Sequence, residues 1–181
     1  MKSISLSTIL QTERLRLRAI SLSDIDLVWS ASRIPGFNDG MVWEPPGNKE
    51  ELVPIAEKNL SAWKEGKSFT FTIELAETNT PIGRIVIRCE DNPNIWNIGF
   101  WIHPDHWNHG YATEAAQTVI EFGIEELAAS KITTAHATWN TASQKVIEKL
   151  GFQFTGENPC GFVKQGKPVS EYEYAIEAKA F

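Results

Sequence analysis

Short runs in which apolar and polar residues alternate recur along the chain and predict a mostly antiparallel sheet. Leu15 and Leu17 alternate with arginines, so their strand should bury one face and turn its arginines to solvent or to carboxylates. Pro104 should end another strand, because proline cannot donate to a sheet ladder. The predicted strands are 12–18, 69–75, 82–89, 97–102 and 132–139, followed by a hairpin of 152–160 and 169–178.

Four other segments carry apolar residues at steps of three and four positions, the spacing of one buried helix face. We expect helices over 24–32 and 48–66, and two more that each follow a predicted strand directly. Gly151 supplies a left-handed stop for the last helix. The expected buried faces are Ile25, Val28 and Trp29; Leu52, Ile55, Ala56, Leu60 and Trp63; Ala112, Ala116, Val119, Ile120, Gly123 and Leu127; and Ala142, Val146, Ile147 and Leu150.

Residues 107–115 form a turn that runs from a predicted strand straight into a predicted helix. Such a turn directs several backbone N–H groups at one point, where the helix macrodipole adds partial positive charge. Gly110 lacks a Cβ and lets a ligand approach closely, and Ala112 lets the helix pack tightly on the sheet. The turn therefore indicates a phosphate site, with a close-packed turn without ligand as the alternative.

A second strand-to-helix unit follows about thirty residues later, and its entrance is polar. The strand 132–139 leads into Asn140 and then Ser143, before the last predicted helix. The Asn140 amide can donate and accept, so it could hold a ligand or a water, or cap the helix. Ser143 could be an ordinary first-turn residue.

Three motifs in this order resemble the GCN5-related N-acetyltransferase superfamily, and within it the branch that acetylates the N-termini of ribosomal proteins. The family's loop Arg/Gln-x-x-Gly-x-Gly/Ala falls on Trp107–Ala112, and its Asn-x-x-Ser…Gly-Phe element falls on Asn140, Ser143, Gly151 and Phe152. Residues 12–18 are similar to the opening strand of that branch. Two positions depart from the pattern: Trp107 replaces Arg or Gln, and Ile147 stands where many relatives carry a catalytic tyrosine.

The resemblance implies an α+β, three-layer fold with a mixed, mostly antiparallel sheet that is splayed at the cofactor site and has helices on both faces. One acetyltransferase domain over 1–181 is the economical interpretation, since 181 residues with 42% hydrophobic content suit one core. The chain holds no run of eighteen apolar residues and no signal-like start, so we expect a cytoplasmic location and no membrane partner. A homodimer is an expectation from the family alone.

The implied activity is acetyl transfer from acetyl-CoA to a primary amine, a protein N-terminus or a small molecule, by direct attack in a ternary complex. No metal is expected, since the two cysteines show no metal-ligand spacing. The strand edge would bind the pantetheine arm, and the turn and the Asn140 region would complete the site. The expected acetyl-CoA contacts are Phe100, Trp101, Ile102, Trp107, Asn108, His109, Gly110, Tyr111, Ala112, Thr113, Asn140 and Ser143.

The irregular stretch 34–48 corresponds in the family to a segment that lines the acceptor pocket, although such loops also merely connect helices. We expect its residues Phe37, Met41, Trp43 and Glu44 to contact the acceptor. For the chemistry, the resemblance gives Ser143 a hydrogen bond to the CoA sulfur. Proton acceptors to consider are His103, whose ordinary pKa suits neutral pH, and the carboxylates Glu44 and Glu74.

The formal net charge of −6 argues against a nucleic-acid partner and favours cationic amines. Cys89 and Cys160 are expected to be buried free thiols. The loss of the tyrosine at Ile147 keeps open an inactive, CoA-binding regulatory protein. A nucleotide-binding module is a third possibility, but the chain lacks the Gly-x-x-x-x-Gly-Lys-Ser/Thr loop.

Overall fold

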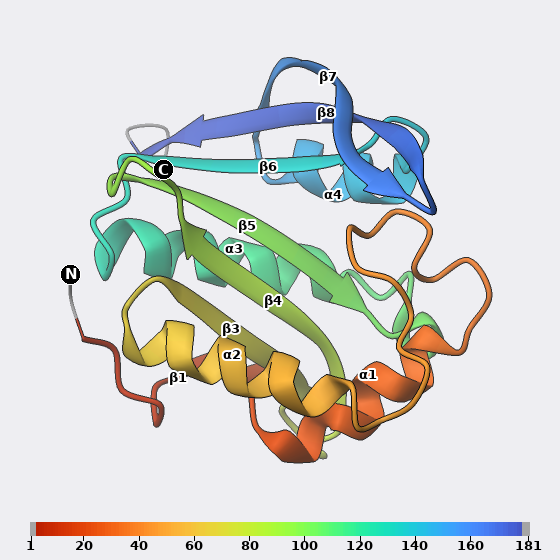
Figure 1. The fold of residues 1–181 in the computed structure, drawn as a ribbon. Coiled ribbons are helices and arrows are strands. Elements are labelled where there is room, and N and C mark those ends of the chain that lie inside the picture. The colour runs from red at the N-terminus through yellow and green to blue at the C-terminus, as the bar shows by residue number, and fades with distance from the viewer. Residues whose placement is uncertain (1–2, 179–181) are drawn as a thin grey trace.

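Eight strands form one mixed sheet within residues 3–178, the part of the chain that the computed structural model describes (Figure 1). The spatial order is β1-β2-β3-β4-β5-β6-β8-β7. Neighbouring strands are antiparallel except β5 and β6, which are parallel. The strands are β1 (Ile9–Gln11), β2 (Leu15–Ala19), β3 (Ser68–Leu75), β4 (Pro81–Cys89), β5 (Ile95–Ile102), β6 (Lys131–Ala137), β7 (Gln153–Lys164) and β8 (Lys167–Glu177).

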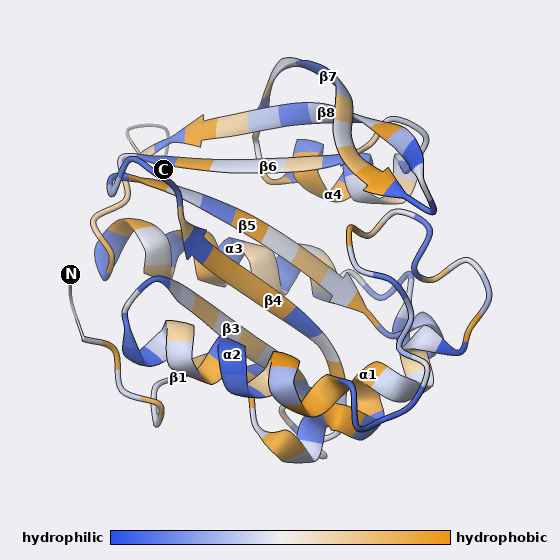
Figure 2. Cartoon of the chain, viewed as in Figure 1, coloured by the Kyte–Doolittle hydropathy of each residue, from blue (hydrophilic) through white to orange (hydrophobic). Residues whose placement is uncertain are grey.

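Helices cover both faces of the sheet, which confirms the predicted α+β architecture. One face carries α1 and α2, and the other carries α3 and α4 (Figure 1). The bounds are α1 (Ile25–Ser32), α2 (Leu52–Lys64), α3 (Tyr111–Glu125) and α4 (Thr141–Lys149), with short 3-10 helices η1 (Leu22–Asp24) and η2 (Pro104–His106). The core lies between α3 and the central strands, where apolar positions alternate with polar ones along β3 and β4 (Figure 2).

Close packing of α3 on the sheet depends on Gly123, which faces β4 and β6. A Cβ added there would lie 2.7 Å from Ile87 Cδ1 and 3.1 Å from Ile132 Cδ1, so a side chain at this position would displace the helix. This contact identifies the faces of the strands: Ile87 and every second residue from it point towards α3. The residues between them point towards α1 and α2.

The sheet is splayed where its two parallel strands part. β5 and β6 pair only from Ile95 with Lys131 to Asn97 with Thr133. Asn97 Nδ2 then donates to Thr133 Oγ1 at 3.1 Å, which closes the paired section with a side-chain bond. Beyond it, the carboxyl ends of both strands lead at the same edge into α3 and α4, the position where ligands bind in parallel sheets.

Several predicted details were wrong. Residues 12–18 form a turn followed by β2, and the short β1 before them was not predicted. In α1 Val28 is buried as predicted, together with Leu27 and Ala31, whereas Trp29 is half-buried under the Arg33 guanidinium. Ile55 on α2 and Ala142 on α4 are exposed.

Both cysteines are free, as expected, but they are not buried. Cys160 is exposed on the twisted hairpin strand β7, and Cys89 is half-buried at the end of β4. Burial and the neighbouring Glu90 carboxylate raise the pKa of the Cys89 thiol, so this sulfur is a weak nucleophile at neutral pH.

Candidate active site

The turn between β5 and α3 has the geometry of an anion site. Gly110 is the N-cap of α3 with φ +80°, and Asn108 also has a positive φ of 65°. Within residues 3–178 the backbone N–H groups of residues 108–113 have no hydrogen-bond partner. Such a row of free donors at the start of a fifteen-residue helix can bind a phosphate group.

Arg14 and Glu114 fix this turn from the outer side. Arg14 Nη1 donates to the His109 carbonyl at 3.0 Å, and its Nε donates to Glu114 at 2.7 Å. Glu114 also accepts from Thr12 Oγ1 and from the Arg14 backbone N–H. Because Arg14 holds the His109 carbonyl on one side, the N–H groups of the turn are directed to the other side.

The charge of Glu114 is stabilised by the same contacts. Burial raises the pKa of its carboxyl, but the hydrogen bonds from Thr12 and Arg14 outweigh burial and hold the pKa below its ordinary value. The Arg14 guanidinium also lies 4.8 Å from the centre of the Tyr111 ring, on which His109 stacks at 5.4 Å. We refer to Thr12, Arg14 and Glu114 as the clamp.

The open edge of β5 offers a smaller set of backbone groups than predicted. His103 N–H donates to the Ile82 carbonyl, and antiparallel pairs alternate along β4 and β5, so the backbone groups of Trp101 face β4. Those of Phe100 and Ile102 face the splay. The Ile102 carbonyl is already bound by Trp107 Nε1 at 2.7 Å, which leaves both backbone groups of Phe100 and the Ile102 N–H.

Asn140 and Ser143 lie at the start of α4, across the splay from β5. Asn140 Oδ1 accepts from the Ser143 N–H at 3.1 Å, so the helix cap considered above is present. The Ser143 hydroxyl has no partner among residues 3–178 and remains available. The Asn140 amide nitrogen approaches the loop before α2, since a Cβ on Gly40 would lie 3.0 Å from it.

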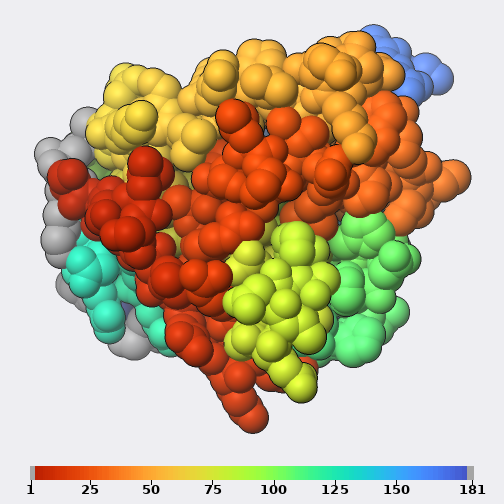
Figure 3. All heavy atoms as spheres, turned by 90° about the horizontal axis from the view of Figure 1, so that it is seen from below, coloured from red at the N-terminus to blue at the C-terminus, as the bar shows by residue number. Residues whose placement is uncertain are grey.

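The loop between α1 and α2 covers the other side of β5. Phe37 is buried and its ring meets Trp101 edge-on at 5.3 Å and Trp43 at 6.2 Å. In Figure 3 this loop, in orange, lies beside the green segment that carries the anion site and the blue tip of the β7–β8 hairpin. Lys164 from that tip donates to the carbonyls of Met41 and Trp43 at 3.1 and 2.8 Å.

Three predicted proton acceptors occupy different surroundings. Glu44 is about half exposed and pairs with Lys164 Nζ at 3.2 Å, so it lies at the rim near the loop. His103 follows β5, is 9% exposed, and its Nδ1 accepts from the Asp105 N–H, so only its Nε2 is unengaged. Beside it, burial and the charge of His103 lower the pKa of His106.

The structure argues against Glu74 as a proton acceptor. Glu74 is buried, and its two oxygens accept from Arg16 Nη1 at 2.8 Å and from Arg18 Nε at 2.7 Å. Asp24 takes the rest of the Arg18 guanidinium. The Glu74 carboxylate therefore joins β2 to β3 and has no oxygen free for a substrate.

Ile147, at the position of the family's tyrosine, is 1% exposed and belongs to the core. Sequence reasoning missed Glu114 and Lys164 as residues that shape the site. An acidic residue in the first turn of a helix was a detectable signal for Glu114. Lys164 gave none, because it meets its partners across more than a hundred residues.

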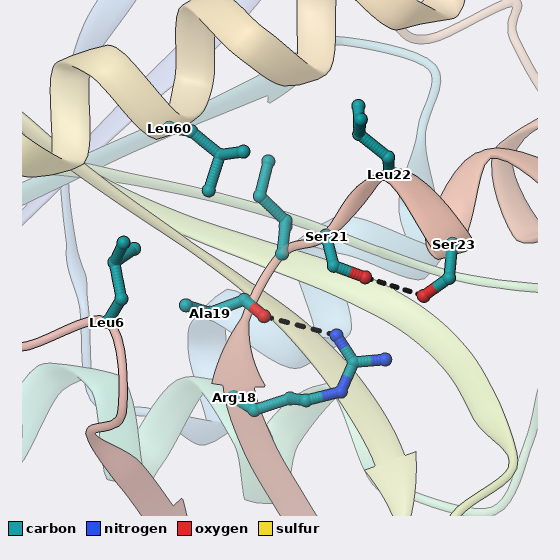
Figure 4. Close-up of a pocket in the computed structure, with 8 residues that line it drawn as sticks. Leu6, Arg18, Ala19, Ser21, Leu22, Ser23 and Leu60 are labelled. Atoms are coloured by element: carbon teal, nitrogen blue, oxygen red, sulfur yellow. Dashed lines mark hydrogen bonds between the residues drawn. The ribbon is translucent and has the colours of Figure 1, made fainter.

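A hollow of about 520 Å³ lies elsewhere, between the end of β2, η1 and α2 (Figure 4). Its one lining cation, Arg18, is engaged by two carboxylates and by the Ala19 carbonyl. The part of the chain that the structure describes contains no cluster of three metal-ligating His, Cys, Asp or Glu side chains. None of its helices is long and apolar enough to cross a bilayer.

A phosphate-type turn beside a splayed parallel strand pair defines a protein that binds a phosphate-bearing ligand at this edge of the sheet. Residues 14–153 match the acetyltransferase (GNAT) domain family, and the chain belongs to this family of N-acetyltransferases. It is 27% identical over 169 residues to the uncharacterized N-acetyltransferase YoaA of Bacillus subtilis, covering 93% of this chain and 96% of YoaA. It is 30% identical over 151 residues to the uncharacterized N-acetyltransferase p20 of Bacillus licheniformis, covering 81% and 83%.

Solved structures share the fold over nearly the whole chain. A GNAT-family acetyltransferase from Bacillus anthracis superposes with a TM-score of 0.84 at 26% identity, covering 95% of this chain and 99% of its own. The ribosomal L7/L12 α-N-protein acetyltransferase RimL, solved with coenzyme A, gives 0.86 at 17% identity, covering 96% and 100%. At that identity the second likeness shows the fold alone.

Proposed function

We propose that this protein transfers the acetyl group of acetyl-CoA to a primary amine, by direct attack in a ternary complex. The observation that carries the proposal is the row of free N–H groups at residues 108–113 beside the open edge of β5. Pyrophosphate would accept from these donors, with the Thr113 hydroxyl as an additional one. The free backbone groups of Phe100 and Ile102 would pair with the pantetheine arm.

The remaining site residues would then act on the acetyl group and the amine. The amine nitrogen attacks the thioester carbon, the C–S bond breaks, and the thiolate leaves with a hydrogen bond from Ser143. The amine's proton passes to His103 Nε2, or through water to Glu44 at the rim. Phe37, Trp101 and Trp43 form the apolar wall of the acceptor side, and Met41 contributes the loop backbone.

Mass spectrometry after incubation with acetyl-CoA and a panel of N-terminal peptides, polyamines and aminoglycosides tests the activity. We expect acetylated product and thermal stabilisation by acetyl-CoA. Stabilisation without any product across the panel would favour the CoA-binding regulatory protein instead. Stabilisation by ATP but not by acetyl-CoA would indicate a nucleotide-binding module.

Two variants test the assigned roles. Ser143→Ala should slow turnover by about tenfold with unchanged acetyl-CoA affinity, since it removes one hydrogen bond to the leaving thiolate. His103→Asn keeps an acceptor for the Asp105 N–H but cannot take up a proton, so turnover should fall while acetyl-CoA affinity stays unchanged. An unchanged rate in either variant would dismiss that role.

A further inference from the structure

Two arginines on β4 point to the acceptor side of the sheet. Arg84 lies opposite Trp101 and Arg88 lies opposite Asn97 in the register of β4 with β5. Both alternate with the residues that face α3, so they share the face of Trp101 and Phe37. Two hydrophilic bands interrupt the largely apolar β4 (Figure 2).

Neither guanidinium has a hydrogen bond or an ion pair within residues 3–178. For Arg84 the Nε atom is fully shielded from solvent and still unpartnered. Asp24, whose negative charge acts on Arg84, already binds Arg18 with both oxygens and accepts from Thr72. Burial lowers the pKa of Arg84 because its charge is poorly compensated.

Arg88 extends from the far end of β4 across β5. A Cβ on Gly99 would lie 2.9 Å from Arg88 Nη2, so the guanidinium rests over Gly99, one residue before the open backbone of Phe100. Arg88 is solvent-exposed at the end of β4. A bound acceptor could therefore reach it.

The loop above this face holds a further unpartnered polar group. Asn38 is 5% exposed, and both its Nδ2 and Oδ1 lack a partner within the described residues. It follows Phe37, whose ring contacts Trp101 opposite Arg84. Buried polar groups in native proteins are normally paired, so unpaired ones beside a candidate site indicate a ligand.

We propose that the acceptor carries a carboxylate close to its amine, and that Arg84 and Arg88 bind this carboxylate. The inference rests on the proposed acetyl transfer and specifies its substrate class. Guanidinium groups suit a carboxylate because their planar fork can donate two parallel hydrogen bonds. The net charge of −6 favours cations at long range, but a plain polyamine would meet two unpaired arginines here.

Matched acceptors test the inference. Three peptides with a free N-terminal serine differ only at the second residue, which is Glu, Gln or Lys. We expect kcat/KM for the Glu peptide to exceed that for the Gln peptide by about tenfold or more, and the Lys peptide to be the poorest. Free glutamate compared with its α-amide separates a small amino acid from an acidic peptide as the source of the carboxylate.

Variants connect this preference to the two arginines. Arg88→Gln and Arg84→Gln should each reduce the Glu-to-Gln ratio of kcat/KM towards one, whereas Arg88→Lys should retain part of it. Lys145→Gln, an exposed change on α4 at the opposite face, is the matched control and should keep the ratio. If Arg84→Gln does not fold, the Glu-to-Gln ratio of kcat/KM in Arg88→Gln, a change at an exposed residue, tests the inference by itself.

Binding of the same peptides to the CoA-saturated protein, measured by calorimetry, separates this inference from the proposed function. Tighter binding of the Glu peptide, lost in Arg88→Gln, would support the inference even if turnover were absent. Equal affinities and equal kcat/KM values for the three peptides would overturn it, while their acetylation would still uphold the proposed function.

Discussion

The two ends of the candidate active site are built in different ways. The cofactor end consists of main-chain N–H groups at a helix N-terminus, held by a clamp that joins residues 12–14 to α3. The acceptor end includes side chains on a long loop, which Lys164 and the Gln165 N–H attach to the β7–β8 hairpin. Main-chain donors on a rigid helix suit a ligand that stays the same, whereas side chains on a loop can be exchanged to fit another acceptor without disturbing the scaffold.

The largest expected effect breaks the cofactor end at Gly110. Gly110→Val should lower acetyl-CoA affinity about 100-fold or more, because a β-branched residue is strained at φ +80° and would distort the turn that presents the free N–H groups. Calorimetry with acetyl-CoA measures the loss. Asn108→Gly, which suits its own positive φ, is the control, and native affinity in Gly110→Val would remove the anion-site assignment.

A change at Lys164 should weaken the acceptor end alone. Lys164→Met removes the donor to the Met41 and Trp43 carbonyls, so the loop loses its position and the KM for the acceptor should rise about tenfold. The acetyl-CoA affinity should stay as it is. The exposed Lys167→Met, on the same hairpin, is the control, and a parallel loss of acetyl-CoA affinity in Lys164→Met would contradict the separation of the two ends.

The clamp should contribute less, since Arg14 and Glu114 are partly exposed to solvent. Glu114→Gln should lower the free energy of unfolding by about 1 kcal/mol and weaken acetyl-CoA binding several-fold. Glu125→Gln, the same change at the other end of α3, is the matched control. Denaturant unfolding and calorimetry measure both quantities, and identical results for the two variants would show that the clamp does not position the turn.

The smallest effect is the pH dependence of that clamp. Because the native pKa of Glu114 is held below its ordinary value, its stabilising contribution is present above about pH 4.5 and is lost as pH falls through the native pKa. The difference in unfolding free energy between wild type and Glu114→Gln should therefore stay constant from pH 8 to 5 and shrink below that. If this difference in unfolding free energy instead grew as the pH fell, the native pKa of Glu114 would lie above its ordinary value, contrary to the prediction.

Local pattern was sufficient for the strand-to-helix units, since each joins a periodic run to its own turn within a few residues. It was not sufficient for Glu74, whose two oxygens meet arginines about sixty positions away. Nor could it show that Trp107 binds the Ile102 carbonyl. The shared face of Arg84 and Arg88 could have been predicted from the sequence, because a spacing of four on a strand places both side chains on one face.

The short parallel contact between β5 and β6 also divides the molecule for its folding. Strands β1–β5 form one antiparallel unit and β6, β8 and β7 another; within the sheet, three residue pairs plus side-chain bridges join them. Closing that junction requires the α3 crossover, so we expect it to form late and to open first in hydrogen exchange. A ligand bound between β5 and β6 would contact both units at once and slow their separation. Unfolding of the two units should therefore become more cooperative as the site fills with ligand.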